Sequence, residues 1–191
     1  MRGVRITSGA LAGRQIKAPQ GPAIRPTADK VRQAIFNILG ASGLATESLS
    51  VLDLFAGSGA FGLEALSRGA ASAVFVDRDG EAVRCIADNA RALGLEERVQ
   101  IIRADAASAL RRLSPRRFDL VFVDPPYRSG DAVETLEELV SHGLLAPRPD
   151  GATVVVEHDR RSPTPETIGQ QSALALYDRR RYGDTEVSFY R

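Results

Sequence analysis

The chain has 191 residues, of which 43% are hydrophobic and 26% charged, and its formal net charge is +1. This composition is typical of a globular domain and excludes a collagen-like, mucin-like or wholly disordered chain. No apolar run approaches the roughly 20 residues that a bilayer span needs, and the start resembles no signal peptide, so we expect a cytoplasmic protein without membrane contact. One cysteine and two histidines argue against disulfides and metal sites.

The N-terminal segment is more basic than the rest of the chain. Residues 1–32 carry seven lysine or arginine side chains against one acid, Asp29, which leaves the remainder with a net charge of −5. Basic side chains near phosphates release counterions, so the asymmetry predicts contact with a polyanion. A solvated basic face is the alternative.

The same segment predicts a small structural unit. Two short runs, 4–6 and 14–17, flank a glycine-containing turn and predict a hairpin, and the apolar spacing over 27–39 predicts a helix. We therefore expect an N-terminal hairpin-plus-helix appendage at residues 1–44 and a main domain at residues 45–191.

From residue 45 onward, short aliphatic runs alternate with longer amphipathic ones. This alternation predicts an α/β fold with a mostly parallel, doubly wound sheet. The predicted strands are 50–55, 73–77, 99–103, 118–123 and 153–157. The predicted helices are 60–68, 80–93, 105–113 and 131–142. A loop over 159–169 and an antiparallel hairpin of 173–182 and 185–190 complete the expected fold.

A glycine-rich turn, GSGAFG at 57–62, follows the first predicted strand of the main domain. Glycines at such a turn let a ligand approach the backbone where a helix begins. Asp53 lies four residues before Gly57, where we expect it to face the ligand. Because a carboxylate repels a pyrophosphate and attracts a sulfonium or ammonium cation, the sequence favours S-adenosylmethionine over a dinucleotide.

Two further acids follow the next predicted strands. Asp77 ends the strand at 73–77, where a carboxylate can accept hydrogen bonds from ribose hydroxyls. Asp105 follows the strand at 99–103. It either receives the adenine amino group or caps the next helix, and the residues leave both roles open.

The tetrapeptide Asp124-Pro125-Pro126-Tyr127 directly follows the strand at 118–123. Prolines stiffen this loop and lack N–H groups, so its carbonyls have no competing donors. The Asp124 carboxylate and the Pro125 carbonyl would form a double acceptor for an exocyclic amine, and Tyr127 can stack on the attached base. The alternative is a rigid loop in which Asp124 only caps a turn.

These motifs resemble a known family. DLFAGSGAFGLEALSRGA at 53–70 together with VFVDPPY at 121–127 resembles the class I, Rossmann-like methyltransferases that use S-adenosylmethionine, and DPPY resembles the motif of those that methylate base amines. RPTADKVRQAIFNIL at 25–39 narrows the resemblance to the RsmD family, and the likeness continues to RYGDTEVSFY at 181–190. That family methylates the N2 amine of one guanine in 16S ribosomal RNA.

The resemblance implies a role for each matching residue. It places the cofactor on Asp53, Phe55, Gly57, Gly59, Asp77 and Asp105. It places the guanine on Asp124, Pro125, Pro126 and Tyr127. Many relatives have a glutamate where this chain has Asp77, whose shorter side chain should still reach a ribose but extends less far toward its two hydroxyls. The implied partner is 16S rRNA or the assembling small subunit, bound by a monomer.

The resemblance also gives the basic segment a partner. We expect phosphate contacts, without base reading, from Arg5, Arg14, Arg25 and Arg32. For Arg25 a second role is open, in which it pairs with the carboxylate of the cofactor.

Three alternatives remain open from the sequence. A DNA adenine-N6 or cytosine-N4 methyltransferase would use the same acceptor motif, but the roughly 45 residues before the sheet leave little room for a target-recognition region. An NAD-dependent dehydrogenase would use the glycines and Asp77 but would leave Asp53 and the DPPY motif without a role. A non-catalytic RNA-binding protein would not need an intact glycine loop.

Overall fold

The computed structural model describes residues 4–19, 27–126, 131–147, 151–170 and 173–191. Its centre is an eight-stranded sheet with the order β5-β4-β3-β6-β7-β10-β9-β8. Five strands run parallel: β3 (Ser50–Leu54), β4 (Ser72–Asp77), β5 (Val99–Arg103), β6 (Leu120–Val123) and β7 (Thr153–Asp159). Three more complete the sheet as antiparallel neighbours: β8 (Thr167–Ile168), β9 (Leu174–Tyr182) and β10 (Thr185–Tyr190).

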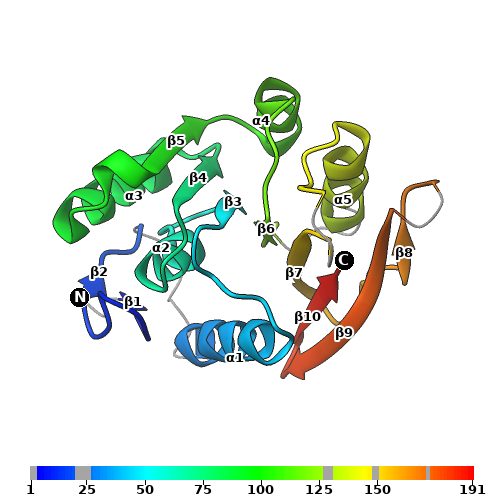
Figure 1. Ribbon diagram of the computed structural model, residues 1–191, viewed down its shortest axis with the longest axis horizontal. Coiled ribbons are helices and arrows are strands. Elements are labelled where there is room, and N and C mark those ends of the chain that lie inside the picture. Colours follow the sequence, from blue (N-terminus) through cyan, green and yellow to red (C-terminus); the bar gives the residue numbers. More distant parts are fainter. Residues whose placement is uncertain (1–3, 20–26, 127–130, 148–150, 171–172) are drawn as a thin grey trace.

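Helices cover both faces of this sheet (Figure 1). One apolar cluster joins the sheet to α1 (Thr27–Ala41), α2 (Ala60–Ser67) and α3 (Gly80–Leu93). A second cluster on the other face joins it to α4 (Ala106–Leu113) and α5 (Asp131–Ser141). The central parallel strands β3, β4 and β6 are apolar nearly throughout because both of their faces are buried, whereas the edge strand β5 is partly exposed.

The predicted fold class is confirmed. Each predicted strand and helix of the main domain exists within a few residues of its expected bounds, and the turn at Gly183-Asp184 joins β9 to β10 as an antiparallel hairpin. One expectation is wrong: the predicted loop at 159–169 contains β8, which pairs with β9. A two-residue strand has no periodicity of its own, so the sequence carried no signal for it.

The N-terminal unit packs closely on the main domain. Its hairpin consists of β1 (Val4–Arg5) and β2 (Gln15–Ile16), and Ile6 is fully buried in the same apolar cluster as Phe75 and Phe122 of the sheet. Both parts therefore contribute to one core. The predicted division into residues 1–44 and 45–191 concerns the roles of the two parts and stays a prediction.

Candidate active site

A sharp turn joins β3 to α2. Phe55, Gly57 and Gly59 all have positive φ angles, of 59°, 54° and 77°. Glycine adopts this region without strain, but a phenylalanine there is rare. Strained residues of this kind concentrate at functional sites, where the surrounding structure holds them in place.

The turn has an open outer side and a tightly packed inner side. A Cβ atom at Gly57 would meet nothing within 4 Å, so a ligand has room to approach the backbone there. At Gly62 the same atom would lie 2.4 Å from the Phe75 ring, which explains why α2 needs a glycine where it crosses the sheet.

Asp77 fastens this turn from the end of β4. Its Oδ2 accepts the N–H of Gly57 at 2.8 Å, and its Oδ1 accepts the N–H of Asp79 at 2.9 Å. Each carboxylate oxygen can accept a second hydrogen bond. Asp77 therefore shapes the glycine loop and keeps acceptor capacity at the edge where a ribose is predicted. Its cofactor role stays a prediction, as do those of Gly57 and Gly59.

Asp53 lies deeper than the sequence suggested. The residue is only 2% exposed, and its Oδ2 accepts the N–H of Gly62 at 2.9 Å. Burial raises its pKa to about 7; the Gly62 hydrogen bond opposes this shift, and the charge of Asp77 adds to it. Asp53 is thus a buried carboxyl group beneath the glycine loop, and its contact with the cofactor stays a prediction.

Asp124 follows β6, whose last residue, Val123, is paired with Leu54 on one side and Val156 on the other. The DPPY motif therefore starts beside the glycine turn, at the carboxyl edge of the sheet. Burial raises the pKa of Asp124 well above its ordinary value, and the charges of Glu157 and Asp53 add to this.

The structure describes two of the three remaining residues of the motif. Pro125 is buried and Pro126 is exposed, whereas Tyr127 lies outside the described residues. The base-holding roles of all four residues stay predictions.

These acids share one electrostatic environment. Asp77 raises the pKa of Asp53, while Asp53 and Glu157 raise that of Asp124. Mutual repulsion among neighbouring carboxylates is relieved when a cation binds close by. The edge of the sheet is therefore suited to a positively charged ligand and unsuited to a pyrophosphate.

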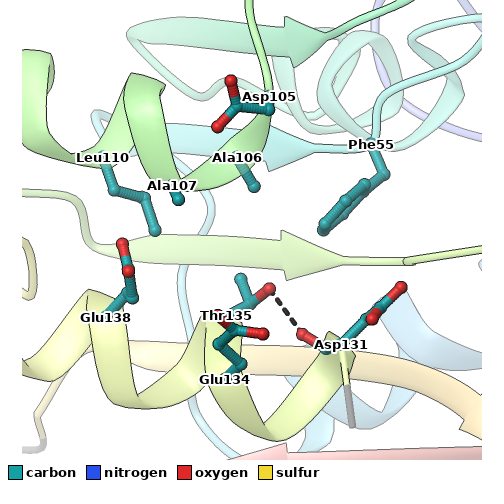
Figure 2. Close-up of a pocket in the computed structure, with 9 residues that line it drawn as sticks. All are labelled: Phe55, Asp105, Ala106, Ala107, Leu110, Asp131, Glu134, Thr135 and Glu138. Carbon is teal, nitrogen blue, oxygen red and sulfur yellow. Dashed lines mark hydrogen bonds between the residues drawn. The ribbon is translucent and has the colours of Figure 1, made fainter. Parts of the chain in front are cut away.

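Asp105 adopts the capping role that the sequence left open. As N-cap of α4, its Oδ1 accepts the N–H of Ser108 at 2.8 Å, and this hydrogen bond lowers its pKa. The same residue lines a cavity of about 160 Å³ between α4 and α5. Figure 2 shows the ring of Phe55 reaching into this space opposite Ala106. The cavity is smaller than most whole-ligand pockets, which span roughly 300–1,000 Å³, so it suits one ring at most.

The four arginines expected to contact RNA have different surroundings. Arg5 and Arg14 are exposed, although Arg14 also donates to the Ala92 carbonyl at 2.7 Å. Arg25 lies outside the described residues. Arg32 requires a correction: it is 2% exposed and pairs with Asp29 at 3.0 Å and Glu64 at 3.6 Å, so it is not placed to reach a phosphate.

Sequence reasoning missed two buried polar residues that attach the hairpin to the main domain. Glu64 accepts hydrogen bonds from the N–H of Thr7 at 2.7 Å and from the N–H of Ser8 at 3.0 Å. Asn89 donates to the carbonyls of Lys17 at 2.9 Å and Ser58 at 3.0 Å. The available signal was a polar residue on the apolar face of a helix, since buried polar side chains need partners.

No group of three or more His, Cys, Asp or Glu side chains in the described ranges is arranged to hold a metal ion. Within those same ranges, no helix is long and apolar enough to cross a membrane.

The strand order and the glycine turn define the fold of the class I methyltransferases. The family model described as Conserved hypothetical protein 95 matches residues 4–191, so the chain belongs to that family, and the predicted resemblance to the RsmD family is confirmed.

Curated relatives and solved structures agree with this. The chain is 39% identical to "Putative rRNA methyltransferase YlbH" of Bacillus subtilis over 98% of each protein. It is 34% identical to Ribosomal RNA small subunit methyltransferase D of Escherichia coli K12, over 96% of this chain and 94% of that protein. The solved structure of yhhF from Escherichia coli superposes with a TM-score of 0.83 at 33% identity, covering 99% of this chain and 97% of the other.

A more distant structure supports the fold alone. SMU.776, which was solved in complex with SAH, has a TM-score of 0.65 at 17% identity and covers 87% of this chain and 50% of its own.

Proposed function

We propose that the protein transfers a methyl group from S-adenosylmethionine to the exocyclic N2 amine of a guanine in 16S ribosomal RNA. The observation that carries this proposal is the position of Asp124 and its two prolines directly beside the glycine turn, among carboxylates that repel one another. The choice of ribosomal RNA is supported by the Escherichia coli relative, a ribosomal RNA small subunit methyltransferase.

The residues present fit this cofactor. The backbone of Gly57 faces open space, and Asp77 holds the loop while keeping acceptor capacity for a ribose. Asp105 and Phe55 border a space of one-ring size. When bound, S-adenosylmethionine supplies a methyl group on a positively charged sulfur, and the carboxylate form of the buried Asp53 beneath the glycine turn favours that charge.

The acceptor residues act by positioning. The lone pair of the guanine N2 is delocalised into the ring, so the amine must be held with that lone pair directed at the methyl group. Asp124 and the Pro125 carbonyl accept the two N–H bonds of the amine, and Tyr127 stacks on the base. As the bond between N2 and the methyl carbon forms, the bond between that carbon and sulfur breaks, and S-adenosylhomocysteine is the leaving group. The amine gives one proton to Asp124 or to water during or after transfer, and no covalent enzyme intermediate is required.

The exposed arginines supply attraction for the RNA backbone. Arg5 and Arg14 project from the hairpin and are available to phosphates, and Arg25 keeps the role that the sequence predicted for it. Arg32 is left out of this set because it is buried.

The test is methyl transfer from labelled S-adenosylmethionine to small-subunit ribosomal RNA, followed by digestion and identification of the modified nucleoside. We expect N2-methylguanosine. Label on an adenine, on a cytosine or on DNA in preference to RNA would overturn the assignment. Titration with NAD in parallel checks the cofactor class.

A further inference from the structure

A polar groove separates the N-terminal hairpin from α1. It has a volume of about 500 Å³, which falls within the range of roughly 300–1,000 Å³ that small-molecule sites occupy. We call it the N-terminal groove, and the residues that matter to its chemistry are Arg5, Thr7, Gln15, Asp29, Lys30 and Gln33.

Ion pairs centred on the buried Arg32 hold the walls of the groove together. Arg32 on α1 donates to Asp29 Oδ1 and to the carbonyl of Arg5, while the N–H of Arg5 is directed at Asp29 Oδ2 at 3.4 Å. Behind this pair, Glu64 of α2 binds Arg32 and the N–H of Thr7. The hairpin, α1 and α2 are therefore cross-linked, and the groove is a preformed feature of the fold.

The groove lies toward the candidate active site. Helix α1 runs in the same direction as α2, because Arg32 pairs with Glu64 and, one turn later, Phe36 stacks with Arg68. The N-terminal end of α1 therefore lies near the end of α2 that carries the glycine turn. Asn89 also links the end of β2 to Ser58 within that turn.

We propose that the N-terminal groove binds one nucleotide of the substrate RNA, a neighbour of the methylated guanine. This inference rests on the proposed function for the identity of the RNA. Arg5 and Lys30 supply two exposed cations for phosphate groups, and Gln15 and Gln33 supply exposed amides that both donate and accept hydrogen bonds at base edges.

The acid in the groove does not cancel these cations. Asp29 pairs with the buried Arg32, and Glu64, which also contacts Arg32, pairs with Arg68 at 2.9 Å, so these four charges sum to zero. The groove therefore adds base contacts to a segment that the sequence suggested would bind phosphates only. Arg32 positions the two walls of the groove and does not contact the RNA directly.

Direct RNA binding tests the groove independently of catalysis. The charge variant is Arg5→Gln with Lys30→Gln. The matched control is Arg111→Gln with Arg112→Gln, which removes two exposed arginines from the far end of α4. Binding of a single-stranded rRNA fragment is measured across a salt series. We expect at least tenfold weaker binding for the charge variant and a slope of log affinity against log salt that is smaller by about 1.4, since each lost contact removes ~0.7.

Gln33→Ala separates base contact from charge. It should weaken RNA binding roughly fivefold, as expected for one lost hydrogen-bonding partner, and leave the salt slope unchanged. In methyl transfer, both groove variants should raise the KM for RNA and leave kcat and S-adenosylmethionine affinity unchanged.

Two results would overturn the inference: equal losses in the groove and control variants, or wild-type RNA binding by both groove variants. If the wild-type protein binds RNA through the groove but transfers no methyl group to it, the proposed function fails and the groove assignment stands.

Discussion

The N–H of Gly62 donates to Oδ2 of Asp53 across the first turn of α2, at a distance of 2.9 Å. A side chain at position 62 would collide with the Phe75 ring. The glycine therefore allows both the close packing of α2 on Phe75 and the hydrogen bond to Asp53. The carboxyl group beneath the cofactor loop is therefore buried by the fold itself, and its protonation is linked to stability.

Asp53 makes the protein less stable as the pH rises. Its pKa is about 7 in the folded state against an ordinary value of 3.8, so the folded state binds more protons between these values. Stability is therefore lost as pH rises from about 4 to about 7 and stays low above that. Asp53→Asn should remove this loss and raise the free energy of unfolding at pH 8 by on the order of 2–4 kcal/mol.

Urea unfolding of both proteins at pH 5 and pH 8 checks this, because the difference between wild type and variant cancels the effects of other titrating groups. An equal difference at the two pH values would show that Asp53 is already ionised in the folded protein at low pH.

Asp77→Ala should weaken S-adenosylmethionine binding by about 1–3 kcal/mol, through loss of charge-assisted hydrogen bonds to the ribose and of the acceptor for Gly57. Isothermal titration measures this. Asp79→Ala is the control, because Asp79 caps α3 nearby but is not assigned to the cofactor. Unchanged affinity in Asp77→Ala would remove Asp77 from the site.

Arg32→Ala should lower the free energy of unfolding by about 3 kcal/mol, because it removes the buried cation between Asp29 and Glu64 and leaves Glu64 with Arg68 as its remaining ion-pair partner. Arg14→Ala, at an exposed position of the same segment, should cost less than ~1 kcal/mol. Denaturant unfolding compares the two. Similar small losses would mean that the buried pair contributes nothing and that Arg32 can be released to solvent.

Several of these features were accessible from the sequence, and others were not. Patterns within one segment predicted the strands, the glycine turn and the place of Asp124, because apolar periodicity and proline chemistry are local. The roles of Arg32 and Glu64 depend on a partner 32 residues away in the chain, which no local pattern encodes. Asp105 had two locally consistent roles, and the structure places it as the N-cap of α4.

Tyr127→Ala should weaken productive RNA binding by about 1–3 kcal/mol through loss of stacking on the base, while Tyr127→Phe should retain most of the wild-type affinity. The KM for rRNA in methyl transfer reports this. Equal losses in both variants would indicate that the hydroxyl group matters more than the ring.

The central claim is that Asp124 holds the reacting amine. The most direct measurement is the single-turnover rate of methyl transfer to ribosomal RNA by wild type and by Asp124→Ala, with S-adenosylmethionine affinity measured alongside. We expect the rate to fall on the order of a hundredfold or more while cofactor affinity stays nearly intact, as when a group that acts mainly in the transition state is removed. A variant that transfers methyl groups at the wild-type rate would contradict the account.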